Sequence, residues 1–85
     1  MARIAIIGMG YVCLVTGAAF AERGHRVVAV DVVRKKVSMV NEGRSPIHED
    51  GLAGLLERHV PERLRATTDL AEAMDGAEFV FIAVG

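Results

Sequence analysis

Apolar residues gather in short runs along the chain, and longer segments of mixed apolar and polar positions separate these runs. Apolar runs of about four to eight residues bounded by turn residues are typical of strands buried on both faces. Three strands are predicted on this basis, at Arg3–Ile7, Arg26–Val30 and Glu78–Val84, and a shorter strand is expected at Leu64–Thr67. The strand at Glu78–Val84 contains the stretch EFVFIAV and carries the strongest strand signal of the chain.

The first two segments between these runs favour helices. Residues Tyr11–Arg23 form the first predicted helix, and Gly24 directly behind them suits a C-terminal cap. In the second, apolar residues recur at helical spacing over Val33–Val40, and the helix is expected to stop at residues 41–43.

Two further helices are predicted in the second half of the chain. One follows Asp50 as its N-cap and ends before Pro61. The other is indicated by Asp69 with Glu72 three residues later, which is the spacing of a capping box, and it would end at Gly76.

Strands that alternate with helices indicate parallel β–α–β units. We therefore predict an α/β fold with a Rossmann-like parallel sheet of four strands in the order 3-2-1-4, flanked by helices. In that order the fourth strand lies at an edge, and EFVFIAV is too apolar for an exposed edge. The sequence thus predicts that another strand covers it in a whole domain, and that the chain alone associates through this edge.

Composition excludes some classes of partner. The 85 residues suffice for one small domain. A net charge of -1 gives no electrostatic reason to expect nucleic acid or a membrane surface. With no Trp, a single Tyr and three Phe, the chain offers few aromatic platforms on which bases could stack.

Cysteine and histidine usage argues against disulfides and metal sites. Cys13 is the only cysteine, which excludes an intrachain disulfide or a zinc cluster of thiolates and suggests a reducing, cytoplasmic compartment. His25, His48 and His59 share no ligand-like spacing, so we predict surface or loop histidines and no metal site.

The stretch IAIIGMGYVCLVTGAAFAERGHRVVAVD, residues 4–31, is typical of a phosphate-binding turn between a strand and a helix. Gly8 lets the chain turn sharply as it leaves the strand, and Gly10 lets a diphosphate approach bare backbone. The helix that begins at Tyr11 then points its N–H groups and the positive end of its dipole at the phosphates. The alternative is a tight strand–helix turn that binds no ligand.

Asp31 ends the second predicted strand about 20 residues after the glycines, where a carboxylate can accept hydrogen bonds from ribose hydroxyls. Its charge disfavours a 2′-phosphate, so NAD is expected as the cofactor, while Arg34 and Lys35 leave NADP open. Asp31 could also act as the N-cap of the helix near Val33, and the two roles are compatible.

Cys13 stands where the third glycine of the fingerprint normally permits close packing of helix against strand. Because a buried cysteine behaves as a compact apolar residue, we expect either a helix displaced slightly from the sheet or a sulfur that fills a small gap. A helix N-terminus can activate a thiol, but no His or Lys stands nearby in the sequence, so a catalytic role is not predicted.

Residues 4–21 also resemble a secretory signal, because Arg3 precedes an apolar stretch and residues 19–21 fit a cleavage site. Against this alternative, three glycines would weaken an apolar helix, and cleavage after Ala21 would remove the strand expected to be central to the sheet. A membrane span is favoured still less.

Five segments together resemble the N-terminal NAD-binding domain of the UDP-glucose/GDP-mannose 6-dehydrogenase family: IAIIGMGYVCLVTGAAFAERGH, VVAVDVVRKKV, NEGRSPIHEDGL, RLRATTDLAEAM and FVFIAVG. The resemblance covers essentially the whole chain, and its most specific parts are G-Y-V after G-x-G and the loop S-P-I-x-E-x-G-L. Family members usually have glycine at Cys13 and proline at Asp50, and they continue beyond Gly85.

The resemblance implies an oxidoreductase of nucleotide-sugar metabolism and polysaccharide biosynthesis. Two successive hydride transfers to NAD would oxidise the C6 alcohol of UDP-glucose to the carboxylate of UDP-glucuronate. GDP-mannose and UDP-N-acetyl-hexosamines are alternative substrates. The family's catalytic residues lie in later segments, so no catalytic residue is assigned and the chain alone would be inactive. The complete enzyme is expected to bind a nucleotide sugar and to form a homo-oligomer.

The same resemblance implies that residues 1–85 are the N-terminal, incomplete part of a dinucleotide-binding domain, without its later half and the substrate domain. The segment from Gly8 to Cys13 corresponds to the diphosphate turn, with Gly10 at its centre. Tyr11 and Val12 would contribute backbone N–H groups to it.

Other cofactor positions are implied farther along. Asp31 would hold the adenosine ribose, and Lys36 matches a basic position on the adenosine side, with a solvated surface charge as the alternative. Val84 and Gly85 would lie where the chain passes along the dinucleotide.

Two functions of other classes remain open. One is a non-catalytic module that responds to NAD and reports its presence to a partner. The other is a structural half-domain that assembles with a second chain.

Overall fold

The computed structural model describes residues 1–46 and 51–82, and its elements lie close to the predicted ones. The strands are β1 (Arg3–Ile7), β2 (Arg26–Val30), β3 (Leu64–Thr67) and β4 (Phe79–Ile82). The helices are α1 (Tyr11–Glu22), α2 (Arg34–Asn41), α3 (Leu52–His59) and α4 (Leu70–Met74).

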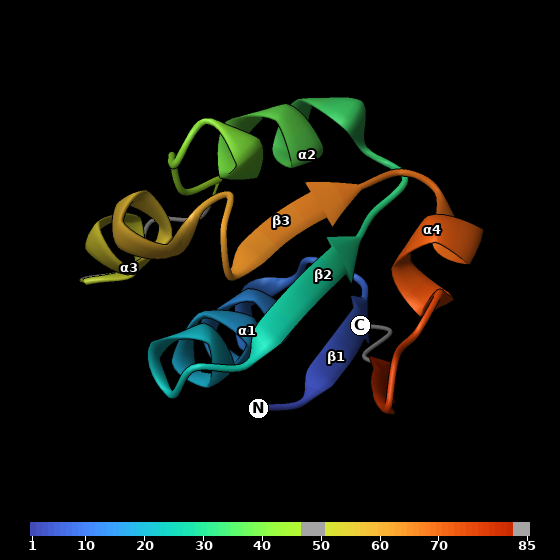
Figure 1. The fold of residues 1–85 in the computed structure, drawn as a ribbon. Coiled ribbons are helices and arrows are strands. Elements are labelled where there is room, and N and C mark those ends of the chain that lie inside the picture. The colour runs from blue at the N-terminus through green and yellow to red at the C-terminus, as the bar shows by residue number, and fades with distance from the viewer. Residues whose placement is uncertain (47–50, 83–85) are drawn as a thin grey trace.

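The four strands form one sheet in the order β3-β2-β1-β4, and each neighbouring pair is parallel. The predicted class and strand order are therefore confirmed (Figure 1). The apolar run of β1 lies inside the sheet, between β2 and β4, and leads directly into α1. Residues 4–21 thus form a central strand and its helix, and in the described part of the chain no helix is long and apolar enough to cross a membrane.

Alternation along the strands sends side chains to two faces. Register aligns Ile6, Ala29 and Ala66 across the three strands β1, β2 and β3, and all three are buried in the main core. Helices α1, α2 and α3 cover this face, and α4 lies on the other one (Figure 1). From β1 the chain crosses the sheet to β2 and β3, and then it returns through α4 to β4 on the other side of β1. Because crossovers between parallel strands are right-handed, this reversal of direction puts α4 on the opposite face.

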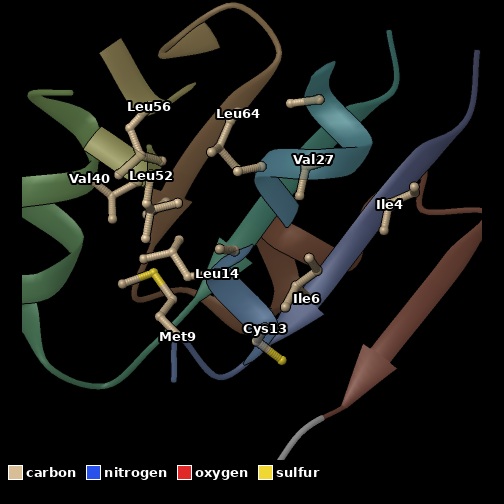
Figure 2. Packing of buried hydrophobic residues seen from close by; sticks show 14 residues of the cluster. Ile4, Ile6, Met9, Cys13, Leu14, Val27, Val40, Leu52, Leu56 and Leu64 are labelled. Carbon is tan, nitrogen blue, oxygen red and sulfur yellow. The ribbon is translucent and has the colours of Figure 1, made fainter. Parts of the chain in front are cut away.

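The core lies between the sheet and the three helices on one face. Met9, Leu14 and Leu56 are among its largest fully buried side chains, and Figure 2 shows them with the strand residues around them. Met9 stands in the turn after β1 rather than in a helix or strand, so the core holds this turn in place.

Element ends agree with the predicted signals where the structure describes them. Gly24 has a φ of +94°, the left-handed conformation that favours glycine behind a helix. The carboxylate of Asp69 accepts a hydrogen bond from the N–H of Glu72 at 3.2 Å, which confirms the predicted cap of α4. The predicted cap at Asp50 and the residue His48 lie outside the described residues.

The two edges of the sheet differ. At β3, the side chain of Asn41 donates to the carbonyl of Ala66 at 2.9 Å and accepts from its N–H at 2.8 Å. This amide occupies edge groups that would otherwise be open to another strand. At β4, all four side chains are exposed, from 39% at Val80 to 69% at Ile82.

His59 corrects the prediction of surface or loop histidines, because its side chain is buried. Its Nε2 lies 2.6 Å from Oε2 of Glu22, and Arg58 contacts the same carboxylate at 3.1 Å. The hydrogen bond with His59, aided by the charge of Arg58, holds the pKa of Glu22 below its ordinary 4.5.

His25 is half-buried, and its Nδ1 accepts the N–H of Ala2 at 2.9 Å. Within residues 1–46 and 51–82, no cluster of three metal-ligating side chains is present.

Candidate functional site

The turn after β1 begins at Gly8, whose φ of +103° lies in the region that residues with a Cβ rarely adopt. Its N–H donates to the carbonyl of Val30 at 2.8 Å, which ties the turn to the carboxyl end of β2. The sharp turn predicted at this glycine is therefore present, and it lies where parallel sheets place their ligands.

Gly10 is the N-cap of α1, and its φ of −74° requires no glycine. A Cβ added here would meet no atom within 4 Å, so the space in front of this backbone is open. Steric freedom for a ligand, rather than conformation, is what glycine supplies at this position.

No negative charge of the helix itself compensates the positive end of the dipole at the amino end of α1. Its first helical hydrogen bond joins the N–H of Leu14 to the carbonyl of Gly10 at 3.0 Å, so the N–H groups of Tyr11 and Val12 precede the helical ladder. No side chain caps this end, and its first turn contains no acid. An anion placed here would meet several N–H groups and the positive end of the dipole.

Asp31 follows β2 and contacts the glycine turn directly. Its Oδ2 accepts the N–H of Met9 at 3.0 Å, and its Oδ1 accepts the N–H of Val33 at 2.9 Å. Partial burial raises the pKa of this carboxyl, but the two backbone hydrogen bonds and the charge of Lys36 outweigh it and hold the pKa below its ordinary 3.8. The carboxylate is therefore ionised at neutral pH, and each oxygen keeps a lone pair for another donor.

The N-cap role considered for Asp31 is wrong in its details. Val33 is the N-cap residue of α2, and no side chain caps that helix. Asp31 stands two residues earlier and binds the N–H of Val33 in a local turn of the type that aspartate favours.

The remaining predicted positions lie around this turn. Val12 is 66% exposed at the amino end of α1. Lys36 is half-buried on the first turn of α2, close enough for its charge to act on Asp31. Val84 and Gly85 lie outside the described residues.

Cys13 is buried at 5% exposure within the main core, beside Ile6 in the cluster of Figure 2. One turn later α1 also packs tightly on the sheet at Gly17, where an added Cβ would lie 2.9 Å from Cδ1 of Ile6. Gly17 therefore performs the packing role that the fingerprint assigns to its third glycine, and the sequence interpretation missed it.

The spacing of Gly17 could have revealed this role. It lies four residues after Cys13, which puts both on one face of the helix. By contrast, no local sequence pattern predicts the hydrogen bond from the N–H of Met9 to Asp31, because it joins residues 22 positions apart.

Comparison with known proteins identifies the family. Residues 2–85 match the model of the UDP-glucose/GDP-mannose dehydrogenase family, NAD binding domain. The chain belongs to this family. The domain that it matches binds NAD, and the open turn at Gly8–Gly10 fits the diphosphate of such a cofactor.

The similar proteins include both UDP-glucose and GDP-mannose dehydrogenases. The chain is 53% identical over 72 residues to UDP-glucose 6-dehydrogenase AglM of Haloferax volcanii, covering 85% of this chain and 17% of that protein. It is 45% identical over 84 residues to GDP-mannose 6-dehydrogenase of Pseudomonas putida, covering 98% of this chain and 19% of the relative.

A solved structure shares the fold closely. A ternary complex of GDP-mannose dehydrogenase from Pseudomonas aeruginosa aligns with a TM-score of 0.93 and 43% identity, over 98% of this chain and 19% of that one. The chain therefore spans about a fifth of the length of the dehydrogenases that it matches.

Proposed function

We propose that this chain holds NAD for a nucleotide-sugar 6-dehydrogenase, as the N-terminal, incomplete part of the cofactor domain. The observation that carries the proposal is the joint geometry of Gly8, Gly10 and Asp31. Open backbone at the amino end of α1 lies beside an ionised carboxylate that already contacts the same turn.

In the proposed complex the diphosphate lies in the turn from Gly8 to Cys13, against Gly10 and the N–H groups of Tyr11 and Val12. Asp31 accepts hydrogen bonds from the adenosine ribose with the lone pairs that the backbone leaves unused. A 2′-phosphate would place negative charge beside this carboxylate, so NAD is preferred over NADP.

Lys36 is proposed to lie on the adenosine side of the cofactor, where its ammonium also balances Asp31. Val84 and Gly85 are proposed to pass along the dinucleotide. These residues bind and orient NAD, which supplies hydride acceptance when bound, and the groups that act on the sugar belong to other parts of the enzyme.

UDP-glucose is the proposed substrate of the complete enzyme, oxidised in two steps at C6 to UDP-glucuronate. The 53% identity to a UDP-glucose 6-dehydrogenase supports it. GDP-mannose is the second candidate, favoured by the similarity to GDP-mannose dehydrogenases along nearly the whole chain. NADH formation by the intact protein with each sugar nucleotide discriminates between them.

The binding proposal is tested by calorimetric titration of NAD and NADP into the chain. Asp31→Ala should weaken NAD binding about 10–100-fold, the loss expected for hydrogen bonds to a charged group. Gly10→Ala should weaken it without altering the circular dichroism spectrum, because the methyl group enters only the open space.

Glu57→Ala is the matched control, since it removes an exposed acid far from the turn in sequence and leaves NAD affinity unchanged. Equal affinities of wild type and both site variants would contradict the proposal, as would tighter binding of NADP than of NAD.

A further inference from the structure

The sheet has a second polar site at the end opposite the glycine turn. Residues at the amino ends of the strands line a cavity of about 220 Å³. Figure 1 shows these strand ends as the tails of the arrows. The lining of the cavity includes four arginines, namely Arg3, Arg26, Arg63 and Arg65. The length of β1, at about 3.3 Å per residue, separates it from Gly8 by roughly 16 Å.

Strand register explains why the arginines gather. Arg3 and Arg26 are direct partners in the β1–β2 ladder, and Arg65 is the partner of Val28, two residues farther along β2. Arg63 immediately precedes β3, and its carbonyl accepts the N–H of Val27 at 2.7 Å. Like charges directly opposite one another across strands are destabilising. The arrangement therefore carries an electrostatic cost that a bound anion would relieve.

Most of these guanidinium groups lack an acidic partner. Arg65 pairs with Glu72 at 3.0 Å. Across residues 1–46 and 51–82, the side chains of Arg3, Arg26 and Arg63 form no hydrogen bond or ion pair. Three unpaired guanidinium groups thus border one cavity in a chain whose net charge is -1.

Acidic residues in the lining do not cancel this charge. Glu62 and Asp75 both line the cavity, and neither lies within ion-pair distance of an arginine there. Four positive and two negative side chains line the cavity, and because Glu72 pairs with Arg65, the local excess is one positive charge. The guanidinium of Arg3 is held against the turn after α4, where a Cβ on Gly76 would lie 2.8 Å from its Nη1.

We infer that this arginine cavity, defined by Arg3, Arg26, Arg63 and Arg65, binds a phosphate or diphosphate group. Guanidinium groups match the oxygens of phosphate, as they do those of carboxylate, in bidentate pairs, and several guanidinium groups together suit the multiple negative charge of a phosphate or diphosphate. The volume of the cavity is below the roughly 300–1,000 Å³ of sites that enclose a drug-sized ligand, so only the anionic group itself would be enclosed. The site is separate from the proposed NAD site and does not depend on it.

Titration with inorganic pyrophosphate, inorganic phosphate and UDP, followed by amide NMR of the chain, tests this inference. Pyrophosphate should shift the amides of Arg26, Val28 and Arg65 in a saturable way. Arg26→Gln should weaken binding at these amides about tenfold, the effect of one lost charged hydrogen bond. Arg23→Gln removes the same charge outside the cavity and should leave the affinity unchanged.

The three ligands distinguish a nucleotide from a free ion as the source of the bound anion. Saturation of the cavity amides by UDP as well would identify a nucleotide as the source of the diphosphate, and saturation by the inorganic ions alone would identify a free ion. If only amides of residues 8–14 shift, or if Arg23→Gln weakens binding as much as Arg26→Gln, the inference is overturned. NAD affinity of Arg26→Gln should equal that of wild type, and a chain that binds no NAD at all would refute the proposed function while leaving the cavity result readable.

Discussion

At the scale of single residues, Asp31 does more than the sequence alone suggests. Its carboxylate accepts hydrogen bonds from the N–H groups of Met9 and Val33, so it fixes the shape of the turn. In the proposed complex the same carboxylate also binds the ribose. Loss of this side chain should therefore affect both the shape of the turn and the affinity for cofactor. Gly10→Ala is the cleaner probe of the diphosphate contact, because it changes neither hydrogen bond.

Two glycines in helices allow a matched test of packing. Gly17→Ala should lower the free energy of unfolding by about 1 kcal/mol or more, because the new Cβ would lie 2.9 Å from Ile6 and crowding costs exceed the gain in helix propensity. Gly54→Ala should raise it by up to about 1 kcal/mol, since no atom lies within 4 Å of the added Cβ. Urea unfolding of both variants measures the difference, and a change of the same sign in both would refute this account of α1 packing.

At the scale of elements, the contact between Glu22 and His59 joins the ends of α1 and α3. A carboxyl whose pKa is lower in the folded state stabilises the fold above its ordinary pKa, and this contribution is lost as pH falls through the lowered value. The stabilisation contributed by Glu22 should therefore be lost only at pH values below 4.5.

Glu22→Gln tests this contribution. The variant should be less stable than wild type at pH 7, and this difference in stability should narrow as the pH falls below 4.5. Urea unfolding at several pH values measures the gap, with Glu57→Gln as the control that shows none. A gap that persists unchanged at the lowest pH would contradict the role of the ionised carboxylate.

Local signals account for the elements that the sequence predicted well. Apolar runs located the bounds of β1 and β2, and the acid pair at Asp69 and Glu72 located the start of α4. Pairing between distant segments left no such signal. The amide of Asn41 on the edge of β3 and the burial of His59 against Glu22 join residues 25 and 37 positions apart. They depend on the assembled fold.

At the scale of the whole molecule, the two sheet edges predict different behaviour. Asn41 occupies the backbone of β3, whereas β4 exposes Phe79, Phe81 and Ile82 and has no neighbouring strand on its outer side within the described part of the chain. An apolar, unprotected edge is a template for another strand. The chain should therefore self-associate as its concentration rises.

Ile82→Lys should suppress this association, because a charge on the edge opposes strand addition. Leu70→Lys is the control, since it changes an exposed apolar residue on α4 away from the edge. Light scattering over a concentration series measures the mass of each variant. A wild-type chain that stays monomeric throughout, or equal suppression by Leu70→Lys, would contradict this assignment.

The geometry of the proposed cofactor site was predictable in outline for the same reason as the fold. The positions of Gly8, Gly10 and Asp31 follow from one strand–turn–helix–strand unit whose spacing is local. The role of Gly17 and the bond from Met9 to Asp31 require knowledge of how closely α1 meets the sheet and how the turn folds back onto β2. Sequence patterns do not contain that information.

The most direct test of the account is a crystal structure of the chain with NAD bound. Diphosphate oxygens should lie within hydrogen-bond distance of the N–H groups of Tyr11 and Val12, and ribose hydroxyls should contact the carboxylate of Asp31. A dinucleotide bound elsewhere, or one at the turn whose ribose does not touch Asp31, would contradict it.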